Sequence, residues 1–204
     1  MATENLLMSW RVIMMRISLF LVFGISILSY NFAAAEGPWR QDTKLLPQYC
    51  KDRAKGIQSA EFTKWRWTLG EAYIHVHHYC DGIYSENKAR VTADEKERKR
   101  WLRNVKGQME YVSRNCSPTC VLFPELHTRW GWALAEDGQS SEAIKHFQMA
   151  IRAKPTYTSA YVKLSDLYLE TNQLDNARRV LEQGLKAKPG SRSLQRRLLE
   201  IEAK

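Results

Sequence analysis

Two adjacent stretches of the chain align with each other and decide the fold: residues 124–157, PELHTRWGWALAEDGQSSEAIKHFQMAIRAKPTY, and residues 158–191, TSAYVKLSDLYLETNQLDNARRVLEQGLKAKPGS. Each is 34 residues long and reads as two amphipathic helices joined by a short turn. Small residues stand where the helices of one hairpin must approach closely: Gly131, Ala143, Ala150 and Ala177. Larger side chains fill the gaps between helices: Trp130, Phe147, Tyr161, Leu164, Tyr168 and Leu181. Pro155 and Pro189 end the second helices because proline cannot continue a helix.

Both stretches resemble tetratricopeptide repeats. The matching positions are Gly131, Ala133, Gly138, Ala143, Phe147, Ala150 and Pro155 in the first, and Tyr161, Leu164, Tyr168, Ala177 and Pro189 in the second. The departures are Trp130 for leucine, His127 for a large aromatic residue, Ser165 for glycine and Gly184 for alanine. The small residues among them preserve the packing, so the resemblance implies a solenoid of stacked helical hairpins.

The rest of the chain is also predicted to be helical, which gives an all-α fold. No stretch alternates apolar and polar residues long enough to predict a sheet. Residues 45–54 predict a short helix, residues 60–90 a long one with Asp81-Gly82 as its candidate point of interruption, and residues 92–116 another that packs antiparallel to it. This degenerate pair is expected to stack on the first repeat. Residues 192–204, with Leu194, Leu198, Leu199 and Ile201, predict a capping helix.

The N-terminal 35 residues have the layout of a secretory signal peptide. Arg11 and Arg16 precede an apolar run at residues 17–30, and Ala33 with Ala35 provides a small-x-small cleavage site. The run is shorter than the roughly 20 apolar residues of a spanning helix. We expect export to the periplasm after cleavage, and the alternative is an uncleaved anchor in the inner membrane. Residues 36–123 then form the helical region that precedes the repeats.

The four cysteines all lie in the part that would be exported: Cys50, Cys80, Cys116 and Cys120. An even number in an oxidising compartment favours two disulfides, for which the sequence allows three pairings. We favour Cys116 with Cys120, which are four residues apart, and Cys50 with Cys80. The second bridge would close a loop of about 30 residues and contribute about 3–4 kcal/mol in the chain-entropy view.

The formal net charge of +9 indicates which partners the protein could bind and says little about its fold. A dense basic block, KERKRWLR, occupies residues 96–103. No nucleic-acid-binding motif is present, and an exported protein rarely meets nucleic acid. An anionic membrane surface or an acidic protein would fit the block, and a solvated helix face explains it without any partner.

The resemblance to tetratricopeptide repeats implies a binding scaffold that has no chemistry of its own. The positions that would face its groove are Glu125, Thr128, Trp132, Ala135, Glu136, Ser159, Val162, Asp166, Leu169 and Glu170. These positions lack the lysine, arginine and asparagine with which one branch of the family clamps a C-terminal carboxylate. We therefore expect a basic or mixed peptide or protein as partner, or a basic segment of a second copy in a homo-oligomer. The predicted role is a periplasmic scaffold in the assembly of an envelope complex, with no cofactor and no enzymatic activity.

The stretch YIHVHHYC at residues 73–80 supports the alternative function, binding or delivery of copper, zinc or heme. On a helix, His75 and His78 share one face, so a third ligand would have to come from elsewhere, such as His127 or His146. Tyr73, Val76 and Cys80 instead form an apolar stripe, which predicts a packing role. The C-x2-C-H motif of covalent heme and the common hydrolase and phosphate-binding motifs do not occur.

Overall fold

The computed structural model describes residues 38–203, so the predicted signal peptide lies outside the described residues. The chain divides into two units, Met1–Arg40 and Gln41–Lys204. In the first unit only a short 3-10 helix, Pro38–Arg40, is described. None of the helices in the described range is both long and apolar enough to cross a bilayer.

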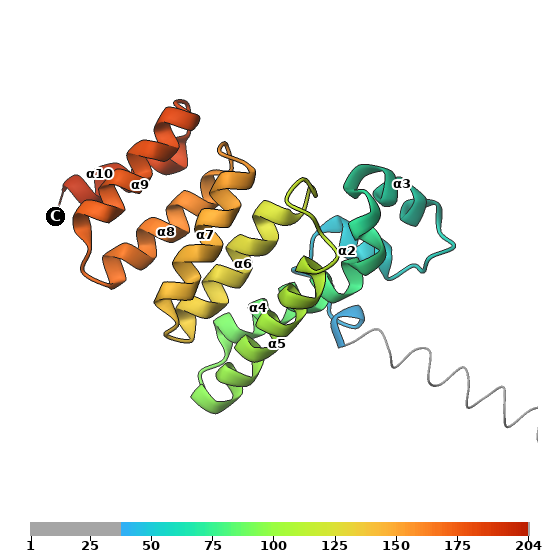
Figure 1. Cartoon of the computed structure of the whole chain (residues 1–204). Helices are drawn as coiled ribbons and strands as arrows, with labels where there is room; N and C mark the ends of the chain where they lie inside the picture. The colour runs from blue at the N-terminus through green and yellow to red at the C-terminus, as the bar shows by residue number, and fades with distance from the viewer. Residues whose placement is uncertain (1–37, 204) are drawn as a thin grey trace, which may run out of the picture. The chain divides into compact units, whose positions relative to one another are not determined.

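The second unit is all-α within its described residues, as the sequence predicts (Figure 1). From α4 onward its helices follow one another as antiparallel neighbours, and each hairpin packs against the next. The elements are α2 (Gln48–Arg53), α3 (Ala60–Leu69), the 3-10 helix η2 (Glu71–His75), α4 (Val76–Val91), α5 (Glu95–Ser113), α6 (Phe123–Glu136), α7 (Ser140–Ala153), α8 (Thr158–Glu170), α9 (Leu174–Ala187) and α10 (Arg192–Glu202).

The expectation of one long helix over residues 60–90 is wrong. The helix breaks at Gly70, whose φ of 73° lies in the left-handed region that glycine adopts without strain. Asp81 and Gly82, the predicted point of interruption, lie inside α4. Gly82 serves close packing, because a Cβ at this position would lie 2.4 Å from the Cε atom of Met109 on α5.

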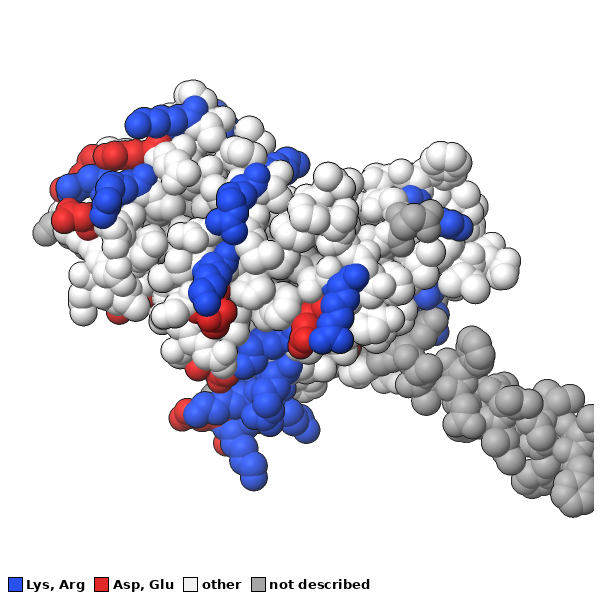
Figure 2. Space-filling model, in the orientation of Figure 1, with Lys and Arg blue, Asp and Glu red and all other residues white. Residues whose placement is uncertain are grey.

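Helices α4 and α5 form the predicted hairpin in front of the repeats. The Asp94 side chain caps α5 by accepting a hydrogen bond from the backbone N–H of Glu97. The apolar stripe of Tyr73, Val76 and Cys80 is fully buried. Figure 2 shows lysine and arginine side chains crowded at one end of this hairpin, where the basic block of residues 96–103 begins α5.

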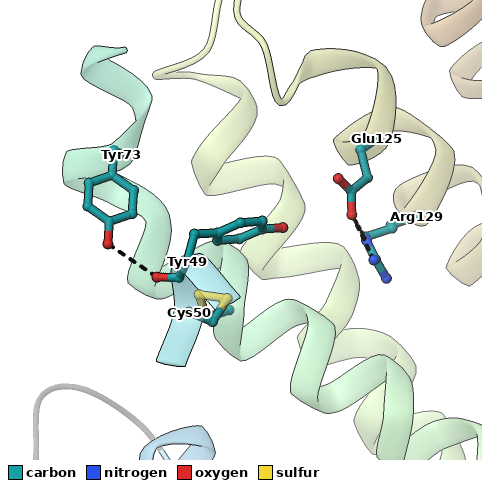
Figure 3. The surroundings of a disulfide bond; sticks show 6 residues. Tyr49, Cys50, Tyr73, Glu125 and Arg129 are labelled. Carbon is teal, nitrogen blue, oxygen red and sulfur yellow. Dashed lines mark hydrogen bonds and ion pairs between the residues drawn. A yellow bond between two sulfur atoms is a disulfide. The ribbon is translucent and has the colours of Figure 1, made fainter. Parts of the chain in front are cut away.

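Two disulfides tie the N-terminal region together, in the pairing that the sequence favours. Cys50 on α2 is bonded to Cys80 on α4, and Cys116 is bonded to Cys120 in the loop between α5 and α6. Beside the first bridge, the Tyr73 hydroxyl donates a hydrogen bond to the Tyr49 carbonyl over 3.2 Å (Figure 3). Helix α2 is thereby held against α4, which carries one wall of the site described below.

The two repeats form the hairpins α6–α7 and α8–α9, and α10 covers the end of the second. Their buried side chains share one continuous core, to which Phe147, Tyr161, Leu181 and Leu194 contribute. Close contact occurs at different positions in the two hairpins. A Cβ on Gly131 would lie 2.8 Å from the Phe147 ring, and a Cβ on Gly184 would lie 2.9 Å from the Tyr161 ring.

Candidate functional site

A groove runs along α4, α6 and α8 and contains two adjoining hollows of about 160 and 100 Å³. Arg90, Trp132 and Lys163 line both hollows. The predicted positions that line one or both are Glu125, Thr128, Trp132, Ala135, Glu136, Ser159, Asp166 and Glu170. The other two, Val162 and Leu169, are half-buried against the core of the repeats.

Trp132 is the aromatic floor of the groove. Its side chain is buried, and the Arg90 guanidinium carbon lies 4.0 Å from the centre of its ring. A guanidinium over an indole face is a favourable cation–π contact. Because Arg90 belongs to α4, this contact also joins the degenerate hairpin to the first repeat.

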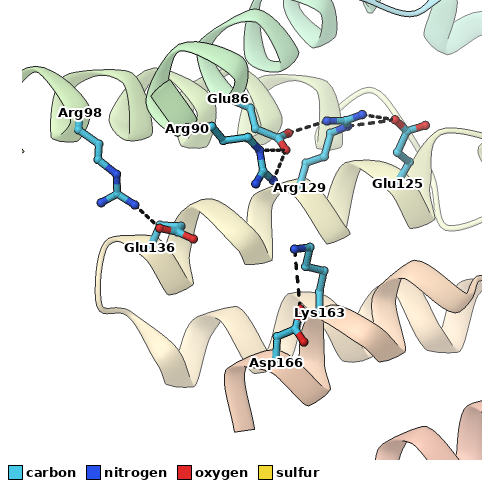
Figure 4. A network of polar contacts seen from close by, with 8 residues as sticks. All are labelled: Glu86, Arg90, Arg98, Glu125, Arg129, Glu136, Lys163 and Asp166. Atoms are coloured by element: carbon cyan, nitrogen blue, oxygen red, sulfur yellow. Dashed lines mark hydrogen bonds and ion pairs between the residues drawn. The ribbon is translucent and has the colours of Figure 1, made fainter. Parts of the chain in front are cut away.

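Arg129 is the centre of a partly buried ionic network on the same wall (Figure 4). Its guanidinium donates to the Glu86 carboxylate over 2.5 Å and to the Glu125 carboxylate over 2.7 Å. The Glu86 carboxylate also accepts a hydrogen bond from Arg90 over 2.7 Å. Removing one member of such a cluster leaves an uncompensated charge, so the network fixes the geometry of this wall.

Two of the other acidic positions of the groove, Glu136 and Asp166, are also paired with cations. Glu136 forms an ion pair with Arg98 of α5. Asp166 lies 2.5 Å from an Arg197 nitrogen of α10 and 3.9 Å from the Lys163 ammonium. Glu170 is exposed and makes no ion pair within the described part of the chain.

The charged residues among the predicted groove positions are all acidic, but the groove itself is mixed in charge because arginine and lysine side chains also line it. The sequence reasoning missed its basic residues: Arg90, Arg98, Arg129, Lys163 and Arg197. Arg129 and Lys163 occupy equivalent places in the two 34-residue units, so the alignment held a signal for these two. The others come from α4, α5 and α10, whose placement against the repeats depends on tertiary packing.

Hydroxyl groups complete the groove near its Glu125 end. The Thr128 hydroxyl donates to the Pro124 carbonyl and is buried, whereas Ser159 is exposed. Tyr157 lines the same hollow, and burial, followed by the nearby Glu125 carboxylate, raises its pKa to about 12. The Tyr157 phenol is thus neutral at physiological pH and offers a hydrogen-bonding group to a ligand.

The histidines of YIHVHHYC are used in packing between η2, α4 and α5. The His78 ring packs at a tilt against the Tyr111 ring, 3.8 Å away between centroids, and its Nδ1 lies 2.7 Å from the Gln108 side-chain oxygen. The His75 Nδ1 lies 3.4 Å from the Tyr111 hydroxyl. Residues 38–203 hold no group of three or more histidine, cysteine or acidic side chains placed to share a metal ion. His75 and His78 thus gain no third ligand there.

His127 and His146, the suggested source of that ligand, contact each other instead. Their Nδ1 atoms are 2.8 Å apart, and the Trp130 ring packs on the His146 ring at 4.2 Å between centroids. Burial, and then the neighbouring His146, lower the pKa of His127 to about 4. Burial also lowers the pKa of His146. This histidine pair therefore belongs to the interior of the first repeat.

Comparisons with known proteins agree with the repeat architecture. The family described as tetratricopeptide repeat matches residues 134–200. A TPR repeat-containing thioredoxin of Arabidopsis thaliana is 43% identical over 58 residues, which is 28% of this chain and 8% of that protein. The crystal structure of a thermophilic TPR protein of Thermus thermophilus is also similar, with a TM-score of 0.57 and 18% sequence identity. The match covers 76% of this chain and 88% of the Thermus chain. Residues 134–200 thus match the tetratricopeptide repeat family, within a fold that resembles a known repeat structure.

Proposed function

We propose that the chain is a protein-binding scaffold and that the groove along α4, α6 and α8 holds a segment of a partner protein. The observation that carries this proposal is the convergence of eight predicted groove positions on two adjoining hollows with the buried Trp132 as their floor. An aromatic anchor surrounded by paired charges is typical of surfaces that recognise peptides.

The charges of the groove favour a partner segment of mixed charge. Glu170 is exposed, so its carboxylate can pair with a basic side chain of the partner. Among the described residues, Lys163 forms a single ion pair, a 3.9 Å contact with Asp166, so its ammonium group can also pair with an acidic side chain of the partner. This refines the expectation of a basic partner. A segment from a second copy of the chain remains within the proposal.

We further propose that the scaffold acts in the periplasm, in the assembly of an envelope complex. The apolar run at residues 17–30 and the two disulfides support export, because disulfides persist in oxidising compartments. An anchor in the inner membrane that faces the periplasm is the alternative. A fusion of the full chain to alkaline phosphatase, with fractionation and sizing of the product, tests both.

The binding proposal is tested by selecting ligands from a peptide library on the purified full chain and measuring their affinity by fluorescence anisotropy. We expect the Lys163→Glu variant to bind the selected peptides about tenfold more weakly than the wild type, because one charged contact is lost. The matched control is Lys145→Glu, because Lys145 is exposed and its ion pair with Glu142 lies within α7, outside the groove. Equal affinities for the wild type and both variants would exclude the groove as the binding site.

A further inference from the structure

A large hollow lies away from the groove, between α7 and α9. It has a volume of about 540 Å³, which is within the range of ligand-binding cavities. Its floor is apolar and belongs to three helices: Ile151 of α7, Leu164 of α8 and Val180 of α9. Tyr168 of α8 also lines it.

The two repeats explain why this hollow exists. Leu164 and Val180 are the equivalents, 34 residues on, of Trp130 and His146. In the first repeat the Trp130 and His146 rings pack against each other at these positions, 4.2 Å apart between centroids. The smaller aliphatic side chains of the second repeat leave the hollow open.

The rim of the hollow is cationic and rich in amides. Arg152 and Arg179 line it and are both exposed. The described lining residues include no carboxylate, and Gln148, Asn176 and Gln183 provide the other polar groups.

Neither arginine is neutralised within the described residues. Arg152 forms no ion pair there. The Arg179 guanidinium donates only to the Asn176 side-chain oxygen and the Asp175 carbonyl. Two uncompensated guanidinium groups above an apolar floor match a ligand that presents carboxylates next to an apolar side chain, since guanidinium binds carboxylate in a fork of parallel hydrogen bonds.

We propose that this hollow is a second binding site, which takes an acidic peptide segment with an apolar side chain between its carboxylates. The apolar side chain lies on Leu164 and Val180, and the carboxylates pair with Arg152 and Arg179. The site is separate from the groove, so one repeat pair is able to hold two segments on different faces.

A fluorescein-labelled heptapeptide of alternating leucine and glutamate is the probe, and its anisotropy is measured with the purified full chain. We expect saturable binding that weakens at least about tenfold in the double variant Arg152→Glu/Arg179→Glu, because two charge-assisted contacts are lost. Because both side chains are exposed, this variant is expected to fold normally, which circular dichroism checks. The double variant Leu164→Trp/Val180→His, which copies the first repeat, should also abolish binding by filling the floor.

Matched controls separate this site from the groove and from simple anion binding. Lys145→Glu, at the position equivalent to Arg179, and Lys163→Glu, in the groove, should leave the affinity unchanged. Unchanged binding in Arg152→Glu/Arg179→Glu, or an equal loss in Lys163→Glu, would overturn the proposal. It would also be overturned if the peptide with lysine in place of glutamate, or with serine in place of leucine, bound equally well.

Discussion

The two repeats, residues 124–157 and 158–191, share one backbone plan and differ in what fills it. The first repeat packs His127, Trp130 and His146 together at positions where the second has Tyr161, Leu164 and Val180. The first is closed and polar in this layer, whereas the second leaves a hollow of about 540 Å³. A repeat therefore fixes the path of the helices and leaves the gaps between them free to differ.

The two repeats also differ in the ion pairs that their equivalent cations, Arg129 and Lys163, form. Arg129 of the first repeat bonds to Glu86 of α4, in a network with little exposure to solvent. Its equivalent in the second repeat, Lys163, forms a single ion pair within residues 38–203, a 3.9 Å contact with Asp166 of its own helix. The first repeat is thus anchored to the N-terminal hairpin, and the cation of the second is left for a ligand.

The largest expected effect comes from removing that anchor. Arg129→Met should lower the free energy of unfolding by about 3 kcal/mol, because the buried Glu86 carboxylate and the half-buried Glu125 carboxylate lose a cationic partner. Lys163→Met should change it by less than about 0.5 kcal/mol, since a long, partly exposed contact contributes little. Urea unfolding of both variants measures the difference. Equal losses would show that the two cations are not held differently.

Overpacking at the two close contacts is expected to come next. Gly131→Ala and Gly184→Ala should each cost about 1–3 kcal/mol, because the added methyl group meets the rings of Phe147 and Tyr161. Gly107→Ala on α5 is the control, since its added methyl would meet nothing within 4 Å. It should stabilise the helix by up to about 1 kcal/mol. Thermal unfolding ranks the three variants, and a stable Gly131→Ala would contradict the packing described.

The histidine pair of the first repeat should make stability depend on pH. The folded pKa of His127 is about 4, below the ordinary value of 6.5, so the unfolded chain binds the proton more tightly. The stabilisation that comes from keeping His127 neutral is therefore fully present above pH 6.5 and is lost as the pH falls toward 4. Near pH 4.5 this loss should lower the free energy of unfolding by about 2 kcal/mol.

The variant His127→Tyr/His146→Val, which carries the residues of the second repeat, removes both titrating groups. The free energy of unfolding of both proteins is measured in urea at pH 7 and at pH 4.5. The decrease between the two pH values should be about 2 kcal/mol smaller in the variant than in the wild type. Parallel declines would mean that neither histidine is held neutral in the folded protein.

The smallest effect concerns the turns between the helices of each repeat. Gly138 and its equivalent Asn172 both have positive φ, of 76° and 57°. Gly138→Ala should cost about 1 kcal/mol because alanine is strained there, whereas Asn172→Gly should stay within about 0.5 kcal/mol of the wild type. Differential scanning calorimetry resolves the two, and a neutral Gly138→Ala would show that the turn relaxes.

The repeats could be predicted from sequence because their signal is local and occurs twice. The small residues at Gly131 and Ala143, and the prolines that end the second helices, act within one hairpin and need no knowledge of distant segments. The N-terminal region has no second copy with which to align it. The break at Gly70 was consequently missed, since a glycine in a helical pattern does not show by itself whether it ends the helix or packs closely as Gly82 does.

Most of the residues that line the candidate groove could also be predicted from the sequence, but the mixed charge of the groove could not. The resemblance to the repeat family locates Glu136 and Asp166 on their own helices, but their ion-pair partners belong to other helices. Arg90 and Arg98 reach the groove from the N-terminal hairpin, and Arg197 reaches it from α10. Long-range ion pairs of this kind leave no spacing pattern in the sequence.

Photo-crosslinking from the groove tests the central claim most directly. Benzoylphenylalanine replaces Lys163 in one version of the full chain and Lys145 in another, both expressed in the native cell and irradiated. Binding in the groove predicts that position 163 yields a defined crosslinked partner or second copy, identified by mass spectrometry, and that position 145 does not. No adduct at position 163, or the same adducts at both positions, would contradict the claim that the groove along α4, α6 and α8 holds the partner.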